Sequence, residues 1–177
     1  MKTILDHRQI SLSIKRLAHQ LLENHVEMKD TVVIGIQPRG IFLSDRIVKE
    51  IRKEMGGNFF YGKLDITFYR DDIRKNIHVP NHTDISFSIE GKNVILIDDV
   101  LYTGRTIRAA LDALMDYGRP EKVELLSLID RRYSRQLPIQ PNYTGKMIDS
   151  IVSQKVKVMW IEKDGRDEVI LLEETEG

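Results

Sequence analysis

Two adjacent carboxylates and a hydroxyl-rich turn are the groups in this chain best suited to chemistry. Asp98 and Asp99 follow the apolar run at residues 94–97, and the turn Thr-Gly-Arg-Thr at residues 103–106 comes next. Two unpaired carboxylates repel each other, and vicinal hydroxyls or a divalent cation relieve that repulsion. The turn offers hydroxyls, a guanidinium and free N–H groups at a predicted helix N-terminus, which favours an anion. Together these groups predict a site for a ribose 5-phosphate.

A simpler interpretation of the same residues is helix capping. Asp98 and Asp99 would then only help to cap the following helix, and Thr106 would be its N-cap residue. Capping would suffice for an isolated Asp-Asp pair, but the whole thirteen-residue arrangement over residues 94–106 favours the ligand site.

The elements that must position these groups alternate between strand and helix. Apolar residues at helical spacing predict helices, and short β-branched runs predict buried strands. Helices are expected over residues 7–28, 41–55 and 106–117. Strands are expected over residues 32–36, 59–68, 94–97, 123–129, 156–161 and 169–172, with a Pro-punctuated loop over 137–143. This order predicts an α/β fold with a parallel sheet, whose working residues lie where strands end.

Length and composition set the wider limits. The 177 residues suggest one domain, and the polar segment at about 71–92 suggests an exposed, mobile arm within it. Cysteine is absent, so disulfides and thiolate nucleophiles are excluded, which fits a reducing cytoplasm. No apolar run reaches the ~18 residues of a membrane span. The 27 basic residues balance 27 acidic ones, so the total charge does not suggest generic nucleic-acid binding.

Three segments carry a resemblance to a known family. Residues 94–106 resemble the ribose-phosphate motif of type I phosphoribosyltransferases, and Asp-Asp-Val-Leu-Tyr-Thr-Gly-Arg-Thr is similar to that of the pyrimidine operon attenuator and uracil phosphoribosyltransferase family. Residues 65–72, Asp-Ile-Thr-Phe-Tyr-Arg-Asp-Asp, resemble the stretch before its flexible arm. Asp130-Arg131, with residues 137–139 and 143–146, resembles the flank of its base pocket. The likeness runs from about residue 5 to about residue 157.

The resemblance implies a fold, a reaction and partners. The fold would be a central, mostly parallel sheet flanked by helices, with a small hood and a flexible arm. The reaction would transfer the phosphoribosyl group of phosphoribosyl pyrophosphate (PRPP) to uracil, giving UMP and diphosphate. Mg²⁺ would be bound mainly through PRPP, with no direct protein metal site. A cytoplasmic homodimer or larger homo-oligomer is expected by analogy.

Site residues are implied in the same way. Asp98 and Asp99 would hold the ribose hydroxyls, and Arg70 would clamp diphosphate or, alternatively, be a surface residue paired with Asp71 or Asp72. The ribose phosphate would be contacted by Val100, Leu101, Tyr102, Thr103, Gly104, Arg105 and Thr106, and diphosphate by Pro38, Arg39 and Gly40. Pro38 departs from the family, where Thr is common, and removes a backbone donor. The base would meet Asp130, Tyr143 and Thr144, unless Tyr143 is a core residue.

The family also implies a second role, as a UMP-responsive protein that binds pyrimidine operon mRNA and controls transcription attenuation. Basic residues suited to phosphate contacts are Lys15, His19, Arg131, Arg135 and Lys146. Asn24 and Gln140 stand where the family usually has Arg, which weakens this expectation. Two alternatives stay open: a regulator with vestigial catalysis, and a purine-type transferase. Tyr102 weighs against the latter, because purine-specific relatives usually have Asp there.

Overall fold

Two sheets organise the chain. The computed structural model describes residues 1–71 and 82–173. The strands of the larger sheet are β2 (Thr31–Ile36), β3 (Tyr61–Leu64), β4 (Asn93–Leu101), β5 (Lys122–Arg132) and β6 (Tyr143–Asp149). Within the described residues their order is β3-β2-β4-β5-β6, and every neighbouring pair is parallel. The predicted parallel α/β sheet is therefore confirmed.

Three helices cover this sheet, α1 (His7–Asn24), α2 (Gly40–Met55) and α3 (Arg105–Leu114). α1 begins with a capping box, in which Asp6 accepts a hydrogen bond from the N–H of Gln9 and the Gln9 side chain accepts one from the N–H of Asp6. α2 ends where Gly56 takes the left-handed conformation, at φ 63°. Short 3₁₀ turns follow at Val26–Met28, Thr67–Tyr69 and Met115–Tyr117.

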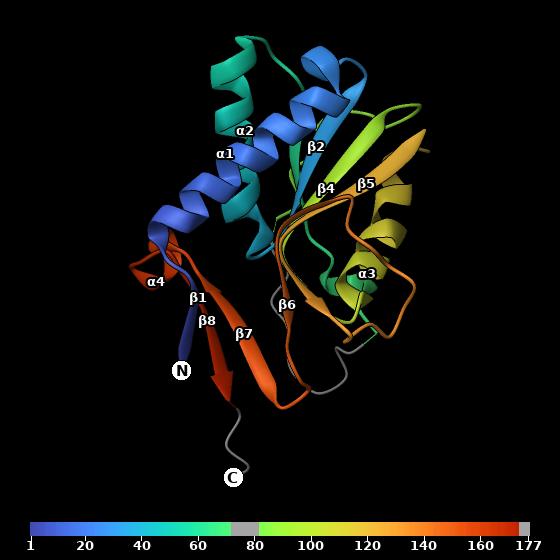
Figure 1. Cartoon of the computed structure of the whole chain (residues 1–177). Helices are drawn as coiled ribbons and strands as arrows, with labels where there is room; N and C mark the ends of the chain where they lie inside the picture. Colours follow the sequence, from blue (N-terminus) through green and yellow to red (C-terminus); the bar gives the residue numbers. More distant parts are fainter. Residues whose placement is uncertain (72–81, 174–177) are drawn as a thin grey trace.

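The helices divide the core into two layers, one on each face of the large sheet (Figure 1). α1 and α2 pack with Val33, Ile95 and Ile97 on one face. α3 packs with Val94 and Leu96 on the other. All six residues of β2 are buried, which explains why its sequence is a continuous apolar run rather than an alternating one.

The smaller sheet forms the hood and joins the two ends of the described chain. It contains β1 (Lys2–Leu5), β7 (Gln154–Met159) and β8 (Glu168–Glu173), with the short helix α4 (Ile161–Asp164) between the last two. β8 lies between β1 and β7 and is antiparallel to both. Figure 1 shows this hood beside the N-terminal end of α1 and below the large sheet. The expected hood is confirmed, although β1 was not predicted.

Several boundaries differ from the sequence-based expectations. The strand expected over 59–68 is limited to Tyr61–Leu64, and a 3₁₀ turn follows. Residues 143–149 form the edge strand β6, which was not predicted as a strand. Its burial is mixed and it contains Gly145, so it lacks the apolar signal of an interior strand.

The carboxyl-terminal part of the segment at 71–92 also differs from the exposed, mobile arm that the sequence predicts. Residues 72–81 of that segment lie outside the described residues. Beyond them, Asp84 exchanges two backbone hydrogen bonds with Lys63, of 2.8 and 2.9 Å. Phe87 stacks on Phe60, and Ile89 is fully buried. Residues 84–92 therefore pack against the large sheet.

Candidate active site

The order of the strands creates a crevice between β2 and β4. These strands are neighbours, but the chain leaves β2 toward β3 on one side and β4 toward β5 on the other. In open α/β sheets, ligands bind at the carboxyl ends of the strands where the order reverses in this way. The loop at residues 37–39 after β2 and the loop at residues 102–104 after β4 both lie at that point.

The acidic pair lies near the end of β4, where the side chains of this strand stop alternating regularly between the two core layers. Residues 94–97 alternate between the two core layers, but Val100 and Leu101 are out of step with that alternation. The break falls at Asp98 and Asp99, and it brings both carboxylates beside the loop after β2. A Cβ on Gly40 would lie 2.9 Å from Oδ1 of Asp98, and Nε of Arg39 lies 3.8 Å from Oδ2 of Asp99.

Both carboxylates are buried, with 8% of each residue exposed. Burial raises the pKa of Asp98 well above its usual range, and the negative charge of Asp99 raises it further. Burial also raises the pKa of Asp99, although Arg39 and the indole N–H of Trp160 act against this. Such a pair favours a ligand that brings hydroxyl donors or positive charge, because either one relieves the buried negative charge.

The loop after β4 forms a pocket of about 230 Å³ at the N-terminus of α3. The lining residues are Arg70, Val100, Leu101, Tyr102, Thr103, Gly104, Arg105, Thr106 and Ile107. Gly104 precedes the helix at φ 94°, a conformation that favours glycine. A Cβ there would also lie 3.1 Å from the Ile139 side chain. The backbone N–H groups at this helix end provide the means to bind a phosphate.

The loop after β2 packs tightly against β4. Pro38 follows a cis peptide bond with Gln37. A Cβ on Gly40 would lie 2.8 Å from the carbonyl oxygen of Ile97, so only glycine fits there. Nη2 of Arg39 donates to Oδ2 of Asp164 and to the carbonyl oxygen of Val158, both at 2.6 Å. The loop thus carries a fixed cation next to the acidic pair.

Arg70 directly follows the 3₁₀ turn at Thr67–Tyr69. Its Nη1 lies 3.3 Å from Oγ1 of Thr106, and its positive charge acts on Asp98. The neighbouring Asp71 accepts hydrogen bonds from Arg105 at 2.6 Å and Arg108 at 3.3 Å. Arg70 and Asp71 thus join the start of the predicted arm to the loop at residues 102–106, which is called the phosphate loop below.

Two arginines, Arg131 and Arg135, support the phosphate loop through contacts with Tyr102. The guanidinium of Arg131 lies 3.9 Å from the centre of the Tyr102 ring. Arg131 is 5% exposed and donates to Ser150 and to the carbonyl oxygens of Ile151 and Gln154. This burial leaves it no surface for RNA, in contrast to the expectation from sequence.

Arg135 is the second of these arginines. It donates to the carbonyl oxygens of Tyr102 at 2.8 Å and Ile139 at 2.7 Å, and it forms an ion pair with Asp130. Asp130 is buried, so its carboxylate serves to fix Arg135. The loop after β5 also contacts the phosphate loop directly, because the N–H groups of Gln136 and Leu137 donate to the carbonyl oxygen of Thr103.

The structure does not bring Tyr143 to this crevice. Tyr143 is 5% exposed and lies in the core layer shared with α1. Its hydroxyl donates to Glu124 at 2.7 Å and accepts from Asn24 at 3.2 Å. This placement matches the core interpretation rather than base stacking. Asp130 and Thr144 line a different pocket, of about 360 Å³, with Arg135, Gln140 and Met147 among its other residues.

The remaining basic candidates lie on the surface. Lys15 and His19 are exposed on α1, and Lys146 is exposed on β6. Arg16 joins these two elements, because its guanidinium donates to the carbonyl oxygens of Thr144 and Gly145. α1 and β6 are therefore neighbours, and each carries one of the exposed lysines, Lys15 on α1 and Lys146 on β6.

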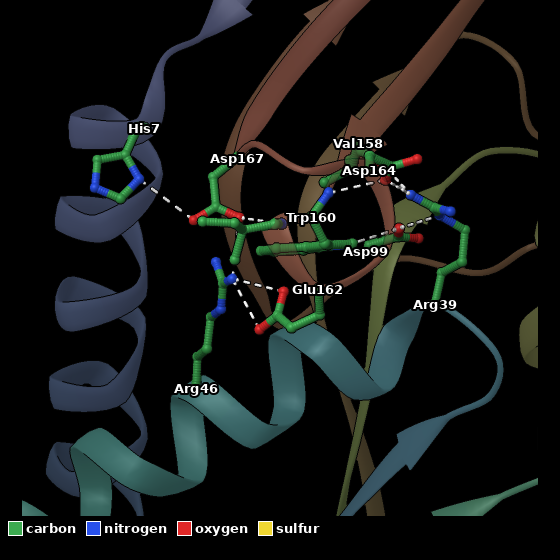
Figure 2. Close-up of polar contacts among 10 residues, drawn as sticks. His7, Arg39, Arg46, Asp99, Val158, Trp160, Glu162, Asp164 and Asp167 are labelled. Carbon is green, nitrogen blue, oxygen red and sulfur yellow. Dashed lines mark hydrogen bonds and ion pairs between the residues drawn. The ribbon is translucent and has the colours of Figure 1, made fainter.

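Sequence reasoning missed the contribution of the hood. Figure 2 shows Trp160 and Asp164 pointing from the hood toward Asp99 and Arg39. Trp160 is fully buried, and its Nε1 lies 3.5 Å from Oδ2 of Asp99. The only signal in the sequence was a lone tryptophan within the strand expected over residues 156–161, which predicts core packing and no particular partner.

Two observations concern the described part of the chain as a whole. No group of three or more His, Cys, Asp or Glu residues there is arranged to hold a metal ion. None of the helices described has the length and apolar character needed to cross a membrane.

Solved structures with the same fold include two hypoxanthine phosphoribosyltransferases. The enzyme from Staphylococcus aureus matches with a TM-score of 0.66 and 22% identity, covering 85% of this chain and 79% of that one. The enzyme from Trypanosoma cruzi matches with a TM-score of 0.73 and 15% identity, covering 97% and 90%. At these identities the likeness establishes the type I phosphoribosyltransferase fold alone.

Sequence comparison is more specific. Residues 1–160 match the model of the phosphoribosyl transferase domain. Bifunctional protein PyrR of Picosynechococcus sp. is 48% identical over 170 residues, which cover 96% of this chain and 96% of that protein. The protein of the same name from Elusimicrobium minutum is 43% identical over 173 residues, covering 97% and 96%. The chain therefore belongs to the phosphoribosyl transferase domain family and, within it, to the PyrR proteins.

Proposed function

We propose that this protein transfers the phosphoribosyl group of PRPP to uracil and releases UMP and diphosphate. The observation that carries the proposal is the buried pair Asp98 and Asp99 beside a helix N-terminus, at the point where the strand order reverses. That arrangement suits a ligand with a diol at one end and a phosphate at the other. PRPP has both groups, and its diphosphate matches the position of Arg39.

Each part of PRPP has a counterpart in the crevice. The 5-phosphate binds the N–H groups of the loop at residues 102–106, with Gly104 allowing its close approach. The ribose hydroxyls donate to Asp98 and Asp99. Diphosphate binds Arg39 and Arg70, because Arg39 lies beside Asp99 and the charge of Arg70 acts on Asp98.

The reaction breaks the bond between C1 of the ribose and diphosphate and forms a bond from C1 to N1 of uracil. Positive charge develops on the ribose as the first bond loosens, and the two carboxylates stabilise that charge. Arg39 and Arg70 stabilise the negative charge on departing diphosphate. N1 loses its proton, and released diphosphate is basic enough to accept it.

Mg²⁺ fits this site as a partner of PRPP rather than as a resident ion. The donor set in the described residues is a carboxylate pair without a third ligand, which suits a cation that arrives with phosphate oxygens. Asp98 and Asp99 are the residues that would contact it. When bound, Mg²⁺ neutralises diphosphate as the leaving group.

Uracil is the proposed base, and a purine is the alternative. Tyr102 supports uracil, since purine-specific relatives usually place Asp at that position. The hypoxanthine enzymes among the structural matches do not favour a purine, because their likeness concerns the fold. Asp130 acts on the site through its ion pair with Arg135, and Thr144 lines the separate pocket beside it.

Incorporation of radiolabelled uracil into UMP, with PRPP and Mg²⁺, tests the proposal directly. We expect turnover of uracil and little turnover of guanine or hypoxanthine. The double variant Asp98→Asn with Asp99→Asn should lose the activity while it keeps its fold by circular dichroism. Turnover of guanine without uracil would assign a purine substrate instead, and an active double variant would remove the acidic pair from the mechanism.

A second function is supported by the relatives, which are named as bifunctional proteins. We propose that UMP strengthens binding of the pyrimidine operon leader RNA to the basic surface formed by Lys15, His19 and Lys146. Arg135 contributes from the neighbouring loop, with 21% of its side chain exposed. A filter-binding assay should show UMP-dependent affinity for the leader. Equal affinity for an unrelated RNA would leave the protein as an enzyme alone.

The wider setting follows from these proposals. PRPP and uracil are cytoplasmic metabolites, so we place the protein in the cytoplasm, as a single domain over residues 1–177. We propose a homodimer or larger homo-oligomer, which light scattering of the purified protein will test.

A further inference from the structure

The hood reaches the acidic pair through the only tryptophan of the chain. Trp160 directly follows β7, is fully buried, and its Nε1 donates to Oδ2 of Asp99 at 3.5 Å. The guanidinium of Arg46 lies 4.6 Å from the centre of the Trp160 ring. Figure 2 shows the indole between Arg46 and Asp99, so one edge of the ring faces the site while Arg46 covers its face.

Asp164, at the end of α4, makes a second connection. Its Oδ2 accepts a hydrogen bond from Nη2 of Arg39 at 2.6 Å and one from the backbone N–H of Trp160 at 3.0 Å. Arg39 also donates to the carbonyl oxygen of Val158 at 2.6 Å. A carboxylate and a carbonyl of the hood therefore fix the guanidinium whose Nε lies 3.8 Å from Asp99.

These contacts address an energetic problem in the crevice. A carboxylate buried like that of Asp99 is costly when ionised, unless donors or cations compensate its charge. Arg39 and Trp160 are the two side chains that act against the effect of burial on its pKa, beside backbone hydrogen bonds at residues 99 and 100. The indole belongs to the hood, and the guanidinium is anchored by it. The orientation and charge of Asp99 thus depend on a part of the chain that carries no phosphoribosyltransferase motif.

We propose that the hood positions the transferase site: Trp160 orients Asp99 to accept a ribose hydroxyl, and Asp164 fixes Arg39 to meet diphosphate. This inference rests on the proposed transferase function. Trp160 and Asp164 are positioning residues in it, because they act on substrate through Asp99 and Arg39.

A neighbouring hood residue provides a matched control. Glu162 accepts hydrogen bonds from Arg46 at 2.9 and 3.0 Å, and 45% of its side chain is exposed. The structure gives it no contact with Arg39 or Asp99 within the described residues. Glu162→Gln therefore changes the hood's surface charge and keeps both connections to the site.

The first experiment compares Trp160→Phe with the wild-type protein and with Glu162→Gln. Phe keeps an aromatic ring for Arg46 and removes the N–H donor. We expect kcat to fall about tenfold, the loss that a hydrogen bond to a charged group predicts. The acidic limb of the kcat/KM profile should move to higher pH, because the Trp160 donor lowers the pKa of Asp99.

The second comparison uses Asp164→Asn, which keeps the shape of the side chain and removes its charge. We expect the KM for PRPP, and that for diphosphate in the reverse reaction with UMP, to rise about tenfold. kcat should change less than KM. Glu162→Gln should resemble the wild-type protein in every one of these measurements.

Fluorescence tests the proposal without altering the hood. Since Trp160 is the only tryptophan, its emission reports on the indole beside Asp99. Titration of the wild-type protein with PRPP and Mg²⁺ should change this emission, and Asp99→Asn should weaken or abolish the change. If Trp160→Phe does not fold, this titration decides the question.

The outcomes separate this inference from the proposed function. A wild-type protein without uracil transferase activity would overturn the proposed function itself. An active wild-type protein would contradict the hood proposal if PRPP leaves its tryptophan emission unchanged. The same holds if folded Trp160→Phe and Asp164→Asn match Glu162→Gln in kcat, KM and pH profile.

Discussion

Single residues set the shape of the crevice by their size and by their hydrogen bonds. Gly40 lets the loop after β2 approach β4, and Gly104 lets the loop after β4 turn into α3. Arg131 and Arg135 then hold that second loop through Tyr102. None of these residues needs to touch the base, yet each one shapes the loops to which we propose that PRPP binds.

Gly40→Ala tests the first of these contacts. The new Cβ would lie 2.8 Å from the carbonyl oxygen of Ile97 and 2.9 Å from Oδ1 of Asp98, so backbone must move. We expect a loss of about 1–3 kcal/mol in the free energy of unfolding, measured in urea, and a raised KM for PRPP. Gly57→Ala is the control, since its Cβ would meet only the flexible end of Met55. Equal behaviour of the two variants would contradict the packing argument.

Arg131→Gln tests the buried support of Tyr102. The substitution removes the donor to the carbonyl oxygens of Ile151 and Gln154. We expect a cost of about 1–3 kcal/mol for each carbonyl left without its donor, seen as a lower Tm, together with a raised KM for PRPP. Arg132→Gln is the control, because Arg132 pairs with Asp149 on the surface and should matter little. An unchanged Tm for Arg131→Gln would argue for a solvent-exposed arginine.

At the scale of elements, a buried polar cluster joins the end of α1 to β5 and β6. Glu124 accepts from the Tyr143 hydroxyl at 2.7 Å and contacts His25 Nε2 at 2.9 Å. Lys122 completes the cluster at 2.7 Å from Glu124. Burial by itself would raise the pKa of Glu124, but the hydrogen bonds from Lys122, His25 and Tyr143 outweigh it and lower that pKa to about 2. The edge strand β6 is thus held by polar contacts as well as by its ladder.

This cluster predicts an acid-dependent contribution to stability. The pKa of Glu124 is lower in the folded protein than its ordinary value of 4.5, so ionised Glu124 favours folding. The contribution is complete above the unfolded pKa and is lost as the pH falls from about 4.5 to about 2. We expect the difference in unfolding free energy between wild type and Glu124→Gln to shrink across that range. A difference independent of pH would show that packing, not charge, explains the effect of the substitution.

At the scale of the whole molecule, the fold combines distant segments into two working surfaces. The hood draws on both ends of the described chain, since β1 pairs with β8. The proposed RNA-binding surface draws on α1 and β6, which Arg16 connects. The total charge is zero, so RNA affinity must come from such local clustering.

The salt dependence of RNA binding tests this surface. Lys15→Gln and Lys146→Gln should each reduce the slope of log K against log salt by about one, because each removes one phosphate contact. Lys163→Gln, on the hood, is the matched control and should leave the slope unchanged. Binding of leader RNA that keeps the wild-type slope in the double lysine variant would move the interface elsewhere.

The sequence by itself determined the parallel α/β sheet and the candidate crevice. Periodicity and β-branched runs are local signals, and the motif at residues 94–106 contains both the acidic pair and the phosphate loop in one short stretch. For this reason the predicted site and the observed crevice coincide at the end of β4. The strand order, which reverses between β2 and β4, was seen only in the structure.

Only the tertiary structure decided which residues support that crevice and which merely lie near it in sequence. Trp160 and Asp99 are 61 positions apart, and no local pattern pairs them. The family resemblance assigned Tyr143 and Arg131 to ligands by their positions, but packing of α1 on β6 and of the 150–154 segment on β5 buries both. Periodicity identifies an element and its buried face, whereas the partners of a polar side chain depend on how the elements pack.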